Sequence, residues 1–162
     1  MKVIEIFGDD RHPQYTEVRE GCRGVIIHEG KILLSYYKRI DQYLIPGGGI
    51  EKDESLKECC IRELCEETGV RVEPHTHYLT LEEYYHEFYF KSHYFLCNYV
   101  GECERALTKN EIAEGLEPRW VDFEDALRIF GSYSTYKDTN EVRYGAYYRE
   151  YLALKEIIEY DI

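Results

Sequence analysis

Three glutamates in one stretch of the chain have the spacing of a helical metal platform. Glu63, Glu66 and Glu67 stand at positions i, i+3 and i+4, which fall on one face of an α-helix, so their carboxylates are expected to converge. Three like charges on one patch repel one another, and a bound cation relieves that repulsion. Mg²⁺ takes oxygen ligands and keeps water and substrate phosphate oxygens in its shell. The spacing therefore predicts a platform for a metal ion.

The residues around this patch have types that suit the same chemistry. Arg62 directly precedes the patch and is expected to pair with Glu54 or Glu63 and fix its direction. Glycines 47 to 49 permit positive φ angles, so the loop can fold tightly and present backbone groups near a phosphate. The alternative is an ordinary amphipathic helix with a solvated acidic face. That alternative leaves the positions of four residues unexplained, namely Gly48, Glu54, Arg62 and Gly69.

The segment from Gly48 to Val70, GGIEKDESLKECCIRELCEETGV, resembles the Nudix box without a departure at any fixed position. Five residues separate Gly48 from Glu54, seven separate Glu54 from Arg62, and the pattern closes on Gly69 and an aliphatic residue. The preceding residues, YLIPGG, resemble the aromatic-x-aliphatic-Pro-Gly-Gly lead-in of the same family, with Tyr43 where Trp is frequent.

The resemblance implies an enzyme that hydrolyses a phosphoanhydride bond in a nucleoside diphosphate derivative. The residues that match the metal ligands of the family are Glu63, Glu66 and Glu67, and Arg62 and Glu54 match the residues that orient them. The implied cofactor is Mg²⁺, with Mn²⁺ as an alternative ion. Metal-polarised water would attack one phosphorus, and the cations would stabilise charge on the attacked and leaving oxygens.

Other site residues are assigned from their place in the chain. Three glutamates before Trp120 are candidates for the general base, Glu111, Glu114 and Glu117, and we select Glu114 among them. Arg23 stands at the head of the first core strand, where related proteins often place a basic residue that contacts substrate. The remaining predicted substrate-binding residues are Gly47, Gly48, Lys38 and Tyr43.

Several substrates and two rival functions stay open at this point. The substrate candidates are nucleoside triphosphates, dinucleoside polyphosphates, ADP-ribose and other nucleoside diphosphate sugars, and the chain length favours a triphosphate pyrophosphohydrolase of the MutT-like kind. The rivals are a catalytically silent nucleotide-binding or regulatory module and an isomerase on the same fold. A silent module is expected to have lost one of the three box glutamates, so the complete box disfavours it.

Composition limits the class of protein and of partner. The length of 162 residues suits one domain, residues 1–162, and the net charge of -12 argues against a nucleic-acid polymer or an anionic membrane as partner. We expect a cytoplasmic protein that acts on a small-molecule nucleotide, with a homodimer through exposed tyrosines of the last helix left open. The six cysteines include no C-x-x-C pair, and we expect reduced thiols.

The pattern of apolar residues predicts alternating strands and helices. The predicted strands are Val25–His28, Ile32–Tyr37, Tyr43–Ile45, the region Val70–Val100 and Trp120–Phe123, and the predicted helices are Ser55–Thr68, Glu124–Phe130 and Glu141–Tyr160. Glycines 47 to 49 predict a loop. In the last helix, an apolar stripe of Tyr147, Tyr151, Leu154 and Ile158 predicts docking against the sheet. The resemblance implies the Nudix α/β/α sandwich, in which a mixed sheet lies between helices.

Overall fold

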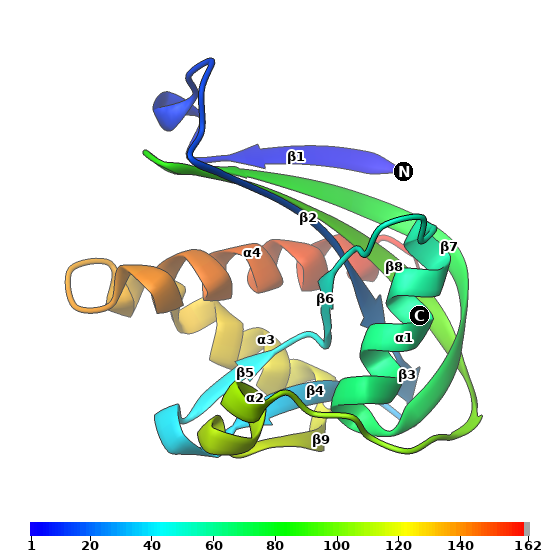
Figure 1. Cartoon of the computed structure of the whole chain (residues 1–162). Helices are drawn as coiled ribbons and strands as arrows, with labels where there is room; N and C mark the ends of the chain where they lie inside the picture. Colours follow the sequence, from blue (N-terminus) through cyan, green and yellow to red (C-terminus); the bar gives the residue numbers. More distant parts are fainter. Residues whose placement is uncertain (161–162) are drawn as a thin grey trace.

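A five-stranded mixed sheet with a helix on each face forms the centre of the protein (Figure 1). The computed structural model describes residues 1–160. The strand order is β1-β7-β8-β2-β6, with parallel pairing of β1 with β7 and of β2 with β8 and antiparallel pairing elsewhere. The bounds are β1 Lys2–Ile6, β2 Glu17–Val25, β6 Gly47–Gly49, β7 Val70–Tyr84 and β8 Phe88–Glu102.

A second, antiparallel sheet packs beside the first. It contains β3 Ile27–His28, β4 Lys31–Tyr37, β5 Gln42–Leu44 and β9 Leu116–Asp122. The helices are α1 Leu56–Thr68, α2 Lys109–Glu114, α3 Phe123–Gly131 and α4 Glu141–Ile158, and short 3-10 turns cover Gly8–Asp10, Lys38–Ile40 and Ser132–Tyr136. The predicted mixed α/β sandwich is confirmed. Within residues 1–160, no helix is long and apolar enough to cross a bilayer.

Helix α1 begins and ends where local sequence signals place it. Ser55 accepts a hydrogen bond from the backbone of Glu58, whose carboxylate accepts one from the backbone of Ser55, so both form a capping box. Gly69 ends the helix in the left-handed conformation, with φ of 73°. Gly24 of β2 lets the helix approach closely, because a Cβ there would lie 2.6 Å from Leu64 Cδ2. These contacts fix the direction of the box helix.

Replacing Ser55 by alanine is expected to lower the free energy of unfolding by about 1 kcal/mol, because the N-cap bond to Glu58 is lost. Urea unfolding measures the change. Ser134→Ala, at an exposed position of a 3-10 turn, is the matched control and should change it by less than about 0.5 kcal/mol. Equal losses in both variants would contradict the importance of this cap.

Two apolar clusters lie on opposite faces of the sheet. The cluster under α1 contains Cys22, Cys59, Cys60, Leu64 and Phe95. The cluster under α4 contains Tyr78, Tyr94, Phe130, Leu154 and Ile157, among others. The predicted stripe of α4 is correct for Tyr147 and Leu154, Tyr151 is half-buried, and Ile158 is wrong because it is exposed while Ile157 packs inward.

Some predicted elements differ from the structure. Glycines 47 to 49 form the short strand β6 rather than a loop, because Gly21 opposite them has no side chain to collide with the carbonyl of Gly48. Strand β1 and helix α2 were not predicted. The region Val70–Val100 is a long hairpin of β7 and β8.

The prediction of six reduced thiols is wrong at two positions. Cys65 of α1 and Cys103 form a disulfide, with their Cα atoms 5.9 Å apart, a separation suited to such a bond. The other four, Cys22, Cys59, Cys60 and Cys97, are free and buried. Pairing across 38 residues cannot be deduced from the spacing of cysteines alone.

Candidate active site

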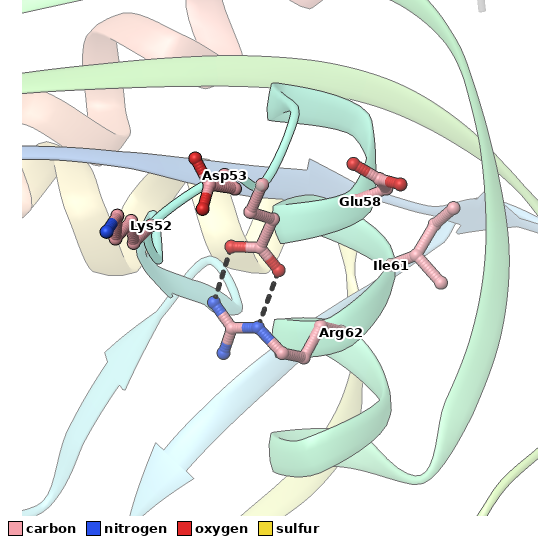
Figure 2. A pocket seen from close by; sticks show the side chains of 6 residues that line it. Lys52, Asp53, Glu58, Ile61 and Arg62 are labelled. Atoms are coloured by element: carbon pink, nitrogen blue, oxygen red, sulfur yellow. Dashed lines mark hydrogen bonds and ion pairs between the residues drawn. The ribbon is translucent and has the colours of Figure 1, made fainter.

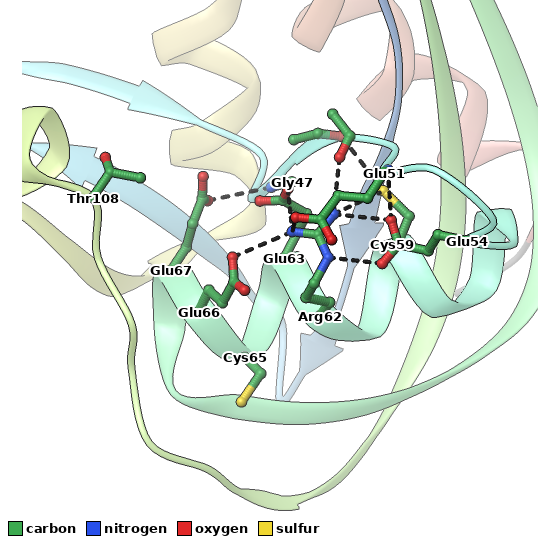
Figure 3. Close-up of polar contacts among 12 residues, drawn as sticks. Gly47, Glu51, Glu54, Cys59, Arg62, Glu63, Cys65, Glu66, Glu67 and Thr108 are labelled. Atoms are coloured by element: carbon green, nitrogen blue, oxygen red, sulfur yellow. Dashed lines mark hydrogen bonds and ion pairs between the residues drawn. The ribbon is translucent and has the colours of Figure 1, made fainter.

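Arg62 is the centre of the polar cluster on α1 (Figure 3). Its Nε and Nη2 donate to the two oxygens of Glu54 over 2.7 and 3.0 Å, and Nη2 also donates to the carbonyl of Gly49 over 2.9 Å. This two-point bond holds the guanidinium plane in one orientation. The Arg62 hydrogen bond also keeps the pKa of Glu54 below its usual range. The predicted pairing of Arg62 with Glu54 is confirmed.

One nitrogen of Arg62 contacts two box carboxylates. Nη1 lies 2.8 Å from Glu63 Oε1 and 3.3 Å from Glu66 Oε2. Burial raises the pKa of Glu63 against the opposing effect of Arg62, and the negative charge of Glu66 raises it further. The guanidinium of Arg62 thus lies between Glu63 and Glu66 and offsets the repulsion of two like charges on one helix face.

Glu67 points away from Arg62 and into the protein. Its side chain accepts hydrogen bonds from the Ser35 hydroxyl over 2.8 Å and from the backbone N–H of Gly47 over 3.2 Å. The residue is only 7% exposed. Burial raises the pKa of Glu67 to about 7, although Ser35 and the charge of Arg23 counteract it. Such a carboxylate is costly to ionise without a nearby cation.

The expectation that spacing alone brings all three carboxylates to one point is not met. Among residues 1–160, no three His, Cys, Asp or Glu side chains are placed to hold a metal ion together. The reason is that Arg62 binds Glu63 and Glu66 while Ser35 and Gly47 hold Glu67. The donor set nevertheless fits a hard cation, since it consists of carboxylate oxygens. Burial makes two of these carboxyl groups, Glu63 and Glu67, harder to ionise.

The glycines beside α1 leave room for the carboxylates. A Cβ on Gly48 would meet the carboxylate of Glu63. Gly47 has a φ of 151°, and a Cβ there would collide with the carbonyl of Cys22. Gly47 is therefore able to present its N–H to Glu67, and Gly48 brings the backbone directly against Glu63.

Arg23 lies beside the site, and its contact with substrate stays a prediction. Its Nη1 donates to the carbonyl of Ile45 over 2.6 Å and lies 3.4 Å from Glu150 of α4. Burial raises the pKa of Glu67 and that of Tyr37, and the charge of Arg23 opposes this rise in both. Arg23 thus lies between the box helix and α4.

Two residues of β4 belong to the site and were not predicted. Ser35 binds Glu67, and the half-buried Tyr37 lies on the same side of the strand, where burial and then the charge of Glu67 raise its pKa. Alternation along the predicted strand places residues 35 and 37 on one face, and that signal could have found them.

The three candidate bases differ in their surroundings. Glu117 pairs with Lys38 over 2.8 Å and with Arg119. Glu111 caps α2 through Thr108, and its negative charge helps raise the pKa of Glu63. Glu114 has a buried Oε2 without a hydrogen-bond partner among the described residues.

The segment before α2 is fastened to the end of the box helix. Arg105 Nε donates to the carbonyl of Glu67 over 3.0 Å, and the N–H of Ala106 donates to the carbonyl of Glu66 over 3.0 Å. Cys65 points to the other side of α1 from the polar cluster (Figure 3), where its disulfide reaches Cys103. These bonds hold α2 near the box carboxylates.

Two predicted substrate-binding residues lie outside this cluster. Lys38 is exposed and forms an ion pair with Glu117. Tyr43 packs on Tyr36, with ring centroids 4.5 Å apart, and its N–H donates to the Tyr147 hydroxyl of α4. The structure therefore does not bring Lys38 or Tyr43 together with Glu63, Glu66 and Glu67.

An open depression of about 420 Å³ lies beside the first turns of α1 (Figure 2). Its lining includes Lys52, Asp53, Glu58 and Ile61, together with the Glu54–Arg62 pair, whose two hydrogen bonds are drawn as dashed lines. One side of the Glu54–Arg62 pair thus faces this depression, so Arg62 remains accessible while it orients its neighbours.

Comparison with known proteins gives this cluster a family context. A family model described as NUDIX domain matches residues 19–139. The matched range includes α1 with all its carboxylates, as well as Arg23 and α2. It excludes β1 and α4.

Solved structures with the same arrangement of elements carry matching names. A NUDIX hydrolase from Nitrosomonas europaea is 20% identical over 68% of this chain and 76% of that one, with a TM-score of 0.58. A MutT protein from Methanosarcina mazei Go1 is 25% identical over 69% and 82%, with a TM-score of 0.54. A MutT NUDIX hydrolase from Burkholderia pseudomallei is 21% identical over 66% and 84%, with a TM-score of 0.53. The similarity supports a shared fold.

Proposed function

Since the chain belongs to the NUDIX family and is a Nudix hydrolase, we propose that it hydrolyses a phosphoanhydride bond of a nucleoside triphosphate or a related nucleoside diphosphate derivative. We propose further that Mg²⁺, or Mn²⁺ in its place, is held by Glu63, Glu66 and Glu67. The partner is a small-molecule nucleotide, and the proposed compartment is the cytoplasm. There the Cys65–Cys103 bond would be exposed to reducing thiols.

One observation supports this proposal most strongly. Arg62 grips Glu54 with two hydrogen bonds and reaches both Glu63 and Glu66 with a single nitrogen. An acidic helix face that was merely solvated would not require these bonds of Arg62. It would also not require the burial of Glu67 against Gly47. The arrangement fits a site that concentrates negative charge where a cation is to be bound.

The residues of the chain have separate tasks in the proposed reaction. Glu63, Glu66 and Glu67 would hold a divalent ion, which would supply Lewis-acid chemistry. Arg62 orients Glu63 and Glu66, and the Gly47 N–H orients Glu67. The water oxygen bonds to phosphorus, the P–O bond of the anhydride breaks, and its electron pair leaves with the departing phosphate oxygen. The proton lost by the water passes to a carboxylate.

We place that proton acceptor on α2. Glu114 offers a buried oxygen without a partner among the described residues, while Glu111 is near enough to raise the pKa of Glu63. Glu117 is already paired with Lys38 and Arg119. Comparing the pH profiles of kcat for Glu111→Gln and Glu114→Gln decides between the first two, because only loss of the base removes the acidic limb.

The experiment that tests the function uses the purified full chain with Mg²⁺ or Mn²⁺ and a panel of nucleotides. The panel contains nucleoside triphosphates, dinucleoside polyphosphates, ADP-ribose and nucleoside diphosphate sugars, and phosphate-bearing products are followed. Cleavage of at least one compound is expected. Folded protein that leaves the whole panel intact would overturn the proposal and favour a module that only binds nucleotides.

Adding Mg²⁺ to chelator-treated protein is expected to raise its melting temperature by several degrees. An ion that binds only the folded chain contributes about 2.7 kcal/mol at 100 times its Kd, which is about 5 °C or more for a domain of this size. Differential scanning fluorimetry measures the shift. Glu66→Gln should reduce it and Glu73→Gln, at an exposed site on β7, should not. Equal shifts in both variants would place the ion elsewhere.

A further inference from the structure

The disulfide between Cys65 and Cys103 joins the box helix to the segment that leads into α2. On α1, Cys65 stands directly before Glu66 and Glu67. On the other side of the bond, Cys103 directly follows the last residue of β8. The bond therefore ties the turn of α1 that carries two of the proposed metal ligands to the segment that ends in the proposed proton acceptor.

The other bonds between this segment and α1 are hydrogen bonds. The N–H of Cys103 donates to the carbonyl of Gly69 over 2.9 Å. Arg105 and Ala106 donate to the carbonyls of the last two box glutamates, over 3.0 Å in each case. Hydrogen bonds of this kind contribute little net stability each, and those at the surface open and close in the native state. Only the disulfide keeps the segment on α1 while they open.

Helix α2 has little packing of its own to hold it in place. Every residue from 98 to 115 is partly or fully exposed, and Leu116 is the first buried residue after them. The helix spans only Lys109–Glu114, and a helix this short is marginal without tertiary packing. Segments with few buried apolar contacts open most readily. The position of α2 therefore depends on its two flanks, the disulfide segment before it and β9 after it.

The two sulfurs of the disulfide lie where a dissolved thiol can reach them. Cys65 and Cys103 are half-buried, whereas the other four cysteines are buried. Two of those four, Cys60 and Cys97, have their Sγ atoms 3.8 Å apart and are nevertheless free thiols. A hydrogen bond with Cys97 and burial raise the pKa of Cys60, which makes it a poor nucleophile. Exchange with an external thiol is thus confined to the exposed pair.

We infer that the Cys65–Cys103 bond is a reversible redox site that holds α2 beside the box carboxylates, and that its reduction by a dithiol releases α2. Disulfides of cytosolic proteins are usually transient and redox-sensing. The effect of release on the reaction rate rests on the proposed function, whereas the release itself does not.

The exchange consumes one dithiol for each disulfide. A thiolate of the dithiol attacks one cysteine sulfur, the S–S bond breaks, and the other cysteine leaves with the electron pair and takes up a proton. The second thiolate of the dithiol then attacks the first sulfur of the dithiol and displaces the remaining cysteine, which is protonated in turn. The dithiol is oxidised to a disulfide, and Cys65 and Cys103 are reduced to thiols.

Release of α2 is expected to lower kcat, because Glu111 and Glu114 of this helix are the proposed proton acceptors. Removing a general base outright costs roughly 10²–10⁴-fold. A base that is only freed to move should cost less, so we expect a loss of at least about 5-fold. The KM should change less than about 2-fold, because the box residues and Arg23 lie on other elements. A disulfide that served stability alone would leave kcat of the folded chain unchanged.

The first test compares the oxidised chain with the chain treated with dithiothreitol and then desalted. Titration of the native protein with a thiol reagent should show two more reactive thiols after treatment, and kcat at saturating nucleotide and Mg²⁺ should fall as stated. The control is the double variant Cys65→Ser, Cys103→Ser, whose kcat should already be low and should not respond to dithiothreitol. Equal kcat in both forms of the wild type, or loss of the folded circular dichroism spectrum on reduction, would overturn the inference.

The second test follows release of α2 without any nucleotide. Trypsin, used without reductant, is expected to cleave the double serine variant after Lys109 at least about 5-fold faster than the oxidised wild type, because cleavage follows the population of the opened segment. Cleavage after Lys137, exposed at the end of the last 3-10 turn, is the control and should be equally fast in both chains. Equal rates at Lys109 would overturn the inference.

These outcomes separate the inference from the proposed function. If both redox forms hydrolyse a nucleotide equally well, redox control is overturned while hydrolysis still stands. If neither form yields product from any nucleotide, the proposed hydrolysis is overturned, and the rate of cleavage after Lys109 still decides whether the disulfide holds α2.

Discussion

Glutamine in place of Glu67 is expected to lower kcat by at least about 10²-fold, the scale of losing one electrostatic group in an active site. The change removes a negative oxygen from the proposed metal site but keeps an oxygen that can accept from Ser35 and Gly47. The fold should therefore survive. Product release at saturating nucleotide and Mg²⁺ measures the loss, and urea unfolding confirms that the variant is folded.

The matched control for this variant is Glu58→Gln on the same helix. Glu58 is exposed and serves the capping box, where glutamine can replace it, so kcat should change less than about 2-fold. If Glu67→Gln keeps activity within 3-fold of the wild type, Glu67 has no part in binding the ion. The metal proposal would then be limited to Glu63 and Glu66.

Methionine in place of Arg149 is expected to lower the free energy of unfolding by about 3–5 kcal/mol, the cost of breaking a buried ion pair from one side. Glu83 and Glu150 are both fully buried and would lose the guanidinium that binds them. These carboxylates currently outweigh the effect of burial and hold the pKa of Arg149 above its ordinary value. Urea unfolding at neutral pH measures the loss.

Arg128→Met is the control for the buried pair. Arg128 pairs with Asp125 at the surface of α3, where both side chains are well exposed, and such pairs contribute about 0–1 kcal/mol. Adding Glu83→Gln to Arg149→Met should recover part of the loss, since one unpaired charge is removed. Similar losses for Arg128→Met and Arg149→Met would contradict the special cost of the buried cluster.

Local signals account for the elements that the sequence predicted well. The box helix could be placed because its start and end signals are local. Ser55 and Glu58 form the capping box at its first turn, and Gly69 ends its last turn. The fork of Arg62 and Glu54 was predictable for a similar reason, since seven intervening residues span two turns of one helix and its entry loop. The identity of the box carboxylates required no knowledge of the rest of the chain.

Features that depend on distant partners were not predicted. Strand β6 is possible because Gly21 lies opposite Gly48, and β1 forms by parallel pairing with β7, more than 70 residues away. The direction of Glu67 depends on Ser35, 32 residues earlier. Arg149 and Glu150 did leave a signal, because two adjacent charges stand between the apolar residues of the last helix, but Glu83, the partner of Arg149, is visible only in the fold.

The buried bond between Arg149 and Glu83 has a consequence for anyone who prepares fragments of this protein. Cutting the chain at the limits of the family match, residues 19–139, would remove α4 and expose the apolar surface that Tyr147, Leu154 and Ile157 cover. It would also leave Glu83 without its counter-ion. A trimmed version should therefore aggregate on expression, and crystallisation or screening work should begin from the untruncated polypeptide.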